Sequence, residues 1–232
     1  GCTLVYHVAA KPGVWGAYDD YYRPNTLGTL NLIEACQDAG VGRLVYTSTP
    51  SVVHGGTDIE GADESLPYAH SFATHYPATK ALAEQAVLAA NSPTLRTVAL
   101  RPHLIWGPGD NHLVPRILDR ARSGRLRLVG PPSPAVDSTY IDDAARAHVM
   151  AAAELAGQGR CAGRAYFISQ GEPWGSDILI NGILNAAGLP PCDRYISPRL
   201  AWFAGACLEF IYWLTRRKDE PPMTRFVAHQ LS

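Results

Sequence analysis

Short apolar segments with the composition of buried β-strands alternate along this chain with longer segments that have helical spacing. The first apolar segment, Thr3–Val8, is followed by small residues, as expected for a strand covered on both faces. This alternation is typical of a parallel sheet with helices packed on both of its faces. We therefore expect an α/β fold. Strands are expected near residues 3–9, 43–48, 95–101 and 164–169, and helices near residues 24–39, 76–91, 112–123, 142–156 and 174–188.

The composition is that of an ordinary globular domain and excludes several classes of function. The 232 residues are 47% hydrophobic and 18% charged, which is enough apolar material for a sizeable core. A net charge of −1 lacks the basic excess of nucleic-acid-binding proteins, so no nucleic-acid partner is expected. The five cysteines and eight histidines show no spacing typical of a zinc site, so we expect no bound metal and no disulfide framework. Such cysteine usage is typical of a reducing compartment, and we expect the cytoplasm.

Tyr76 and Lys80 stand one helical turn apart in a segment with helical spacing. Positions i and i+4 of a helix lie on the same face, so the Lys80 ammonium is expected beneath the Tyr76 phenol. A neighbouring cation favours the ionised phenol and lowers its pKa from the usual value of about 10. A hydroxyl such as that of Thr49, where the preceding strand ends, would complete a site that polarises a carbonyl and protonates it.

Further motifs surround this pair in a characteristic order. They are His7-Val8-Ala9-Ala10-Lys11, Asn25-Thr26-Leu27-Gly28-Thr29, Tyr46-Thr47-Ser48-Thr49-Pro50-Ser51-Val52-Val53, Leu100-Arg101-Pro102, Gly107-Pro108-Gly109-Asp110 and Thr139-Tyr140-Ile141-Asp142-Asp143. Together they resemble the extended short-chain dehydrogenase/reductase superfamily, and within it the 3β-hydroxysteroid dehydrogenase branch, over most of the chain. Residues 76–90, 100–110, 165–173 and 221–226 look more narrowly like the bacterial 2-alkyl-3-oxoalkanoate reductases of long-chain olefin biosynthesis.

The resemblance implies a partial Rossmann-like, doubly wound parallel sheet with a small C-terminal substrate-binding lobe. Residues 1–165 are expected to form the C-terminal part of the NAD(P)-binding domain, and residues 166–232 mainly the lobe, incomplete at its C-terminus. Members of this family open with a strand, a glycine-rich turn and a helix that hold the cofactor pyrophosphate, and this chain shows no such motif. We expect that the chain begins within the domain, that the first βαβ units are missing, and that this piece binds dinucleotide poorly.

The resemblance also assigns roles to single residues. Tyr76 would protonate the carbonyl oxygen, Thr49 would bond to the same oxygen, and Lys80 would hold the nicotinamide ribose and tune Tyr76. Ser48 is a rival to Thr49 for the hydroxyl role, and Asn25 is expected either beside the site as a catalytic residue or at the start of a helix. The residues expected to contact the cofactor are Ala9, Ala10, Lys11, Thr47, Ser48, Tyr76, Lys80, Pro102, His103 and Leu104.

The expected activity is that of an NAD(P)-dependent oxidoreductase, with NADPH or NADH as the reductant, that interconverts a 3-oxo and a 3-hydroxy group on a hydrophobic substrate. Reduction of a 2-alkyl-3-oxoalkanoate to the β-hydroxy acid is the leading expectation. A 3β-hydroxysteroid or sterol dehydrogenase and a nucleotide-sugar epimerase or dehydratase are the alternatives. The apolar character of residues 195–214 speaks against a sugar diphosphate, which needs polar and basic residues to hold it. The presence of Thr49, Tyr76 and Lys80 together speaks against a relative without catalysis.

Residues 198–217 form a strongly apolar segment with aromatic side chains near both ends and basic residues behind it. Glu209 interrupts the segment, which disfavours a membrane-spanning helix. A helix in the membrane interface and an ordinary helix in a substrate lobe or dimer contact both remain open. The family resemblance suggests a homodimer that pairs through the helices near residues 24–39 and 76–91. The expected location is the cytoplasm, with peripheral membrane association as the variant of that expectation.

Overall fold

The computed structural model describes residues 1–56, 59–130, 133–215, 217 and 221–225 of the chain. The chain divides into two compact units. The first contains Gly1–His103 and Asp142–Ser169, and the second contains Leu104–Ile141 and Gln170–Ser232. These units differ from the expected division at residue 165, because residues 104–141 leave the first unit and belong with the C-terminal segment.

The first unit is built on a parallel four-stranded sheet, and the expected α/β fold is confirmed. The order of the strands is β1-β2-β3-β8, so β1 and β8 form the two edges of this sheet. Each pair of neighbours is parallel, with Val45 of β2 opposite Tyr6 of β1 and Val98 of β3. The strands are β1 (Leu4–His7), β2 (Arg43–Thr47), β3 (Arg96–Pro102) and β8 (Arg164–Ile168).

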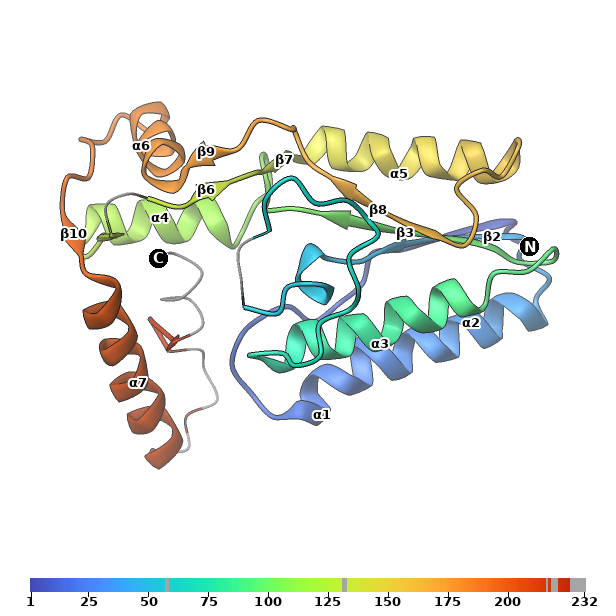
Figure 1. The fold of residues 1–232 in the computed structure, drawn as a ribbon, viewed down its shortest axis with the longest axis horizontal. Helices are drawn as coiled ribbons and strands as arrows, with labels where there is room; N and C mark the ends of the chain where they lie inside the picture. Colours follow the sequence, from blue (N-terminus) through green and yellow to red (C-terminus); the bar gives the residue numbers. More distant parts are fainter. Residues whose placement is uncertain (57–58, 131–132, 216, 218–220, 226–232) are drawn as a thin grey trace. The chain divides into compact units, whose positions relative to one another are not determined.

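Helices cover both faces of this sheet, as the alternating sequence pattern predicts (Figure 1). Leu44 and Tyr46 of β2 point to the face covered by α2 and α3, and Val45 between them points to the face covered by α5. All three side chains are fully buried, because successive residues of a strand point to opposite faces and both faces are covered. The helices concerned are α2 (Gly28–Asp38), α3 (His75–Ala89) and α5 (Ile141–Ala156), the last of which has its first residue in the second unit.

The helical segment expected near residues 24–39 begins earlier and contains a wider turn. It opens with α1 (Tyr18–Tyr21), continues as a π-helix, η1 (Tyr22–Leu27), and only then becomes α2. Pro24 has no N–H to donate to the preceding turn, which is compatible with the change of helix type at this point. The π-helix turns the polar residues Asn25 and Thr26 into the buried side of the unit.

The second unit combines helices with short two-stranded pairings. Its apolar core contains Ile117, Leu126 and Leu184. The expected helices near residues 112–123 and 174–188 are present as α4 (Leu113–Arg122) and α6 (Ser176–Ala186). A third helix, α7 (Pro198–Leu214), starts at Ser197, whose hydroxyl caps the Leu200 N–H. The strand pairs are β4 (Ile105–Trp106) with β7 (Thr139–Tyr140), β5 (Leu128–Val129) with β10 (Tyr195–Ile196), and β6 (Ala135–Val136) with β9 (Trp174–Gly175).

Across the described ranges, no helix has both the length and the apolar character that crossing a membrane requires.

Candidate active site

The carboxyl ends of three neighbouring parallel strands bring most of the expected site residues to one edge of the sheet. Residues 9–11 follow β1, residues 47–49 end β2, and residues 102–103 end β3. Backbone hydrogen bonds tie these ends together, since the Ser48 N–H donates to the Leu100 carbonyl at 2.6 Å. Ligands of open parallel sheets bind at this edge. Leu104, which was expected in the same set, belongs to the second unit.

Lys80 is held in a defined position below this edge. It lies on α3 one turn after Tyr76 and is 2% exposed. Its Nζ donates a hydrogen bond of 2.7 Å to the Thr47 carbonyl and lies 4.2 Å from the centroid of the Tyr46 ring. The carbonyl and the aromatic face both favour a cation, so the chain supplies a preformed seat for the ammonium.

Thr49 is the hydroxyl residue that contacts Tyr76. Burial raises the pKa of the Tyr76 phenol, and a hydrogen bond with the Thr49 side chain opposes that rise. Thr49 also accepts a hydrogen bond from the Ser51 N–H at 3.3 Å, as the residue that caps the short 3₁₀ helix η2 (Pro50–Val52). Both Thr49 and Tyr76 are half-buried, so the phenol remains reachable from the open edge.

Ser48 occupies a different environment from Thr49. Its side chain is buried, and its Oγ has no hydrogen-bond partner within the described ranges. The structure thus brings Thr49, and not Ser48, against Tyr76, while the Ser48 hydroxyl stays available to another polar atom at the strand end.

The expected lowering of the Tyr76 pKa by Lys80 is not found in this structure. Burial is the largest influence on Tyr76 and raises its pKa. Lys80 is itself so well shielded from water that burial lowers its own pKa to about 7, against an opposing effect of the Glu84 carboxylate. The expectation treated Lys80 as a permanent cation, and burial of the lysine removes that premise.

Asn25 is a buried clamp rather than a helix cap, so the helix-starting alternative is wrong. It lies inside the π-helix η1 and is 1% exposed. Its Oδ1 accepts a hydrogen bond of 2.7 Å from the Lys11 N–H, and its Nδ2 donates to the Lys11 carbonyl at 3.1 Å. The same Nδ2 donates to the Thr79 hydroxyl at 3.1 Å. Asn25 thereby connects the loop after β1 with the helix that carries Tyr76.

Lys11, Ala9 and Ala10 are exposed where β1 ends. The Lys11 Nζ lies 3.8 Å from a carboxylate oxygen of Asp20 and 4.9 Å from the centroid of the Tyr21 ring. The methyl side chains of Ala9 and Ala10 leave this part of the edge open to the close approach of a ligand.

Two histidines support the site although no role was expected for either of them. His7 Nε2 lies 2.8 Å from the Thr29 hydroxyl, which donates its own proton to the Asn25 carbonyl at 2.6 Å, so His7 is the donor. His148 of α5 donates through Nδ1 to the Ala144 carbonyl and accepts from the Thr47 hydroxyl at 2.7 Å. The Thr47 side chain is thus occupied by His148, while its carbonyl holds Lys80. His7 stood in a quoted motif, whereas the contact of His148 spans 101 residues of sequence and leaves no local signal.

Glu84 and Arg101 form a buried ion pair behind Lys80 that sequence reasoning also missed. The closest approach is 2.6 Å, and the side chains are 0% and 4% exposed respectively. The available signal was the spacing of Glu84, which stands four residues after Lys80 and therefore on the same face of α3.

Comparison with known proteins finds a matching family and similar relatives. Residues 1–197 match the family described as the 3-beta hydroxysteroid dehydrogenase/isomerase family. The chain is 56% identical over 234 residues to a 2-alkyl-3-oxoalkanoate reductase of Stenotrophomonas maltophilia, covering 100% of this chain and 71% of that protein. It is 51% identical over 240 residues to a 2-alkyl-3-oxoalkanoate reductase of Shewanella oneidensis, covering 100% of this chain and 62% of that protein.

The fold is also similar to that of a solved sugar-nucleotide enzyme. The structure of UDP-glucose 4-epimerase from Thermus thermophilus, a complex with NAD, matches with a TM-score of 0.69 and 28% sequence identity. The match covers 85% of this chain and 66% of that one.

Proposed function

Because this chain belongs to the 3-beta hydroxysteroid dehydrogenase/isomerase family, we propose that it carries the catalytic residues of an NAD(P)-dependent oxidoreductase. The reaction interconverts a 3-oxo group and a 3-hydroxy group on a hydrophobic substrate. The leading substrate is a 2-alkyl-3-oxoalkanoate, which is reduced to the β-hydroxy acid. Support comes from two relatives of that name, which are 56% and 51% identical to this chain over its whole length.

The residues at the sheet edge suit a nicotinamide dinucleotide. Ala9 and Ala10 leave an exposed, uncrowded strand end, and the buried Ser48 Oγ lacks a partner within the described residues. The proposed contacts are those expected from the sequence at this edge. They are Ala9, Ala10, Lys11, Thr47, Ser48, Tyr76, Lys80, Pro102 and His103, and from the second unit Leu104. When bound, the nicotinamide supplies the hydride that adds to the carbonyl carbon.

In the reductive direction, Tyr76 gives its phenolic proton to the substrate carbonyl oxygen, which becomes the hydroxyl of the product. The raised pKa of Tyr76 keeps this proton in place near neutral pH, as an acid requires before the reaction. Thr49, hydrogen-bonded to Tyr76, donates to the same carbonyl oxygen and fixes its position. Lys80 supplies a positive charge below the phenol and favours the phenolate that forms.

The observation that carries this proposal is the convergence of Thr49, Tyr76 and Lys80 at the carboxyl edge of the sheet in a chain 56% identical to a 2-alkyl-3-oxoalkanoate reductase. The test is a substrate comparison with the full-length protein. Oxidation of NADPH and of NADH is followed by near-ultraviolet absorbance with a long-chain 2-alkyl-3-oxo acid, with a 3-oxosteroid, and without substrate. Turnover of the keto acid and not of the steroid is expected, and the faster cofactor identifies the reductant.

Two other activities are favoured by specific observations. The family description favours a 3β-hydroxysteroid or sterol dehydrogenase, and turnover of the steroid alone would select it. The likeness to UDP-glucose 4-epimerase favours a nucleotide-sugar enzyme. Conversion of UDP-glucose, assayed by chromatography of the sugar nucleotides, together with silence toward both ketones would select that activity.

We propose that the protein forms a homodimer through η1, α2 and α3. Leu27, Leu30 and Leu82 are 42%, 40% and 44% exposed, although leucine side chains gain free energy when they leave water. Light scattering is expected to give the dimer mass. The variant Leu30→Glu combined with Leu82→Glu is expected to give the monomer mass, and a dimer mass for this variant would contradict the proposal.

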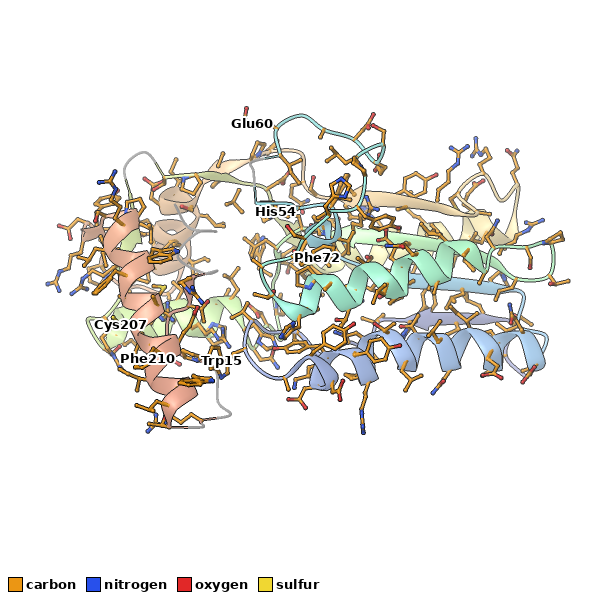
Figure 2. The ribbon with its side chains drawn as sticks, turned by 60° about the horizontal axis from the view of Figure 1, so that its bottom comes forward. Trp15, His54, Glu60, Phe72, Cys207 and Phe210 are labelled. Carbon is orange, nitrogen blue, oxygen red and sulfur yellow. The ribbon has the colours of Figure 1, made fainter. Side chains whose placement is uncertain are left out.

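We further propose that α7 contacts an anionic membrane surface. Its exposed side carries large apolar side chains, among them Phe210, which Figure 2 labels beside the exposed Cys207. Arg199 is exposed on this helix, and Glu209 is paired with Arg225 at 2.6 Å. The expected segment 198–217 includes Arg216, which lies outside the described residues. The exposed apolar side chains of α7 are Leu200, Trp202, Phe203, Phe210, Ile211, Trp213 and Leu214.

Sedimentation with vesicles of phosphatidylglycerol and phosphatidylcholine tests the membrane contact. We expect the full-length protein to co-sediment, and Phe210→Ser combined with Trp213→Ser to abolish this. Trp174→Ser is the matched control, because Trp174 is 51% exposed in the same unit but on β9. Equal sedimentation of all three proteins, or none of any, would contradict this contact.

A further inference from the structure

Three side chains of α3 lie in one row along the helix. Tyr76, Lys80 and Glu84 follow one another at intervals of four residues, which places them on the same face one turn apart. Lys80 is 2% exposed and Glu84 is 0% exposed. The row therefore runs from the half-buried phenol at the site into the interior of the unit, and it ends on a buried carboxylate.

The Glu84 carboxylate is fixed by two other elements. Arg101 at the end of β3 donates from Nη2 to Oε1 at 2.6 Å and from Nε to Oε2 at 3.1 Å. Tyr68, in the loop before α3, donates its hydroxyl to Oε1 at 2.8 Å. The Arg101 guanidinium itself lies 5.2 Å from the centroid of the Phe167 ring. With both oxygens held this way, the carboxylate has a set orientation.

This fixation leaves Glu84 near Lys80 without making them an ion pair. The ion pairs of the described residues include Glu84 with Arg101 but not Glu84 with Lys80. The Lys80 Nζ instead donates to the Thr47 carbonyl at 2.7 Å. Glu84 thus acts on Lys80 through space and leaves the ammonium directed toward the site.

The other groups around Lys80 supply no negative charge at neutral pH. His7 on β1 has a pKa lowered by burial and by Lys80, which keeps it neutral. Burial raises the pKa values of Tyr46 on β2 and of Tyr76 on α3, so both phenols keep their protons. Burial lowers the pKa of Lys80 to about 7, and the opposing influence comes from Glu84. Arg101 on β3 carries the opposite charge but is bound to Glu84 on its far side.

We propose that Glu84, held by Arg101 and Tyr68, is a positioning residue that keeps the Lys80 ammonium charged in the active site. The inference rests on the proposed oxidoreductase function, in which Lys80 must carry a proton to favour the Tyr76 phenolate. A charge placed one turn away keeps Lys80 protonated, and a direct ion pair would instead turn its Nζ away from the site.

The first test is the pH dependence of kcat/KM for reduction of the 2-alkyl-3-oxo acid by the full-length protein. In the wild-type protein, kcat/KM should fall above about pH 7 as Lys80 loses its proton. In Glu84→Gln this alkaline limb is expected to move to lower pH by about one unit, with a loss of about fivefold at pH 7. Glu84→Asp, which keeps the charge, is expected to restore most of that shift.

Two control variants separate charge from structure. Tyr68→Phe removes a hydrogen bond to Glu84 but no charge, so the protein should lose stability while its alkaline limb stays in place. Glu154→Gln removes an equal charge from an exposed pair with Arg160, and the limb should again stay in place. A limb in Glu84→Gln that coincides with the wild-type limb, or an equal shift in Tyr68→Phe, would overturn the proposal.

A second measurement is independent of turnover. The chain contains the lysines Lys11, Lys80 and Lys218, so the ¹³Cε signal of Lys80 can be assigned with Lys80→Met in ¹³C-lysine-labelled protein. The titration midpoint of this signal is expected to be lower in Glu84→Gln than in wild type, and an equal midpoint would overturn the inference. If the wild-type protein turns over none of the tested substrates, the proposed function fails, while the midpoint still decides whether Glu84 acts on Lys80.

Discussion

The substitution Asn25→Ala is expected to destabilise the protein by about 3 kcal/mol. Asn25 is 1% exposed, and its side chain makes three hydrogen bonds, two to the backbone of Lys11 and one to the Thr79 hydroxyl. Each such bond contributes about 1 kcal/mol to stability, and alanine can replace none of them. The higher helix propensity of alanine offsets only about 0.6 kcal/mol, and the small cavity left behind acts in the opposite direction.

Urea unfolding followed by circular dichroism measures this loss as the change in the free energy of unfolding. Asn91→Ala is the matched control, because the Asn91 side chain accepts a single hydrogen bond, from the Thr97 N–H at 3.0 Å. The control is expected to lose about 1 kcal/mol, a third of the loss in Asn25→Ala. If Asn25→Ala loses no more than Asn91→Ala, the clamp between the β1 loop and α3 does not hold the site in the way described.

Three further outcomes follow from the structure. Thr49→Ala is expected to lower kcat by about a hundredfold and Ser48→Ala by less than about threefold, since Thr49 is the hydroxyl beside Tyr76; equal losses in steady-state assays would contradict this assignment. Lys80→Met should remove the fall of kcat/KM above about pH 7 from whatever activity remains, because the titrating group is gone; an unchanged limb would assign it to another residue. Gly107→Ala, at φ +144 and with its new Cβ 2.5 Å from Ile141 Cγ2, should cost at least about 2 kcal/mol in thermal unfolding, against about 1 kcal/mol for Gly124→Ala, where nothing lies within 4 Å.

The sheet could be predicted because its signal is local. Leu44, Val45 and Tyr46 form an apolar run that both faces of a covered strand require, and the other strands show the same pattern. Tyr76 and Lys80 could be paired because a helix places positions i and i+4 together whatever the rest of the fold does. The edge of the sheet followed, since the carboxyl ends of parallel strands meet.

The remaining features depend on contacts between distant segments. The pairs His148 with Thr47 and Arg101 with Glu84 join residues 101 and 17 positions apart, and no spacing rule predicts either. Burial of Lys80 under the Tyr46 ring changed its pKa and overturned the expected effect on Tyr76. The departure of residues 104–141 from the first unit is likewise a property of the tertiary fold and not of any local pattern.

The most direct test of the account is the turnover of Tyr76→Phe in the full-length protein. Nicotinamide oxidation is measured with a long-chain 2-alkyl-3-oxo acid, and circular dichroism verifies that the variant is folded. Loss of the proton that Tyr76 gives to the carbonyl oxygen is expected to lower kcat by at least about a hundredfold. A folded variant that keeps nearly full activity would contradict the assignment of Tyr76 as the acid, and with it the mechanism built on this site.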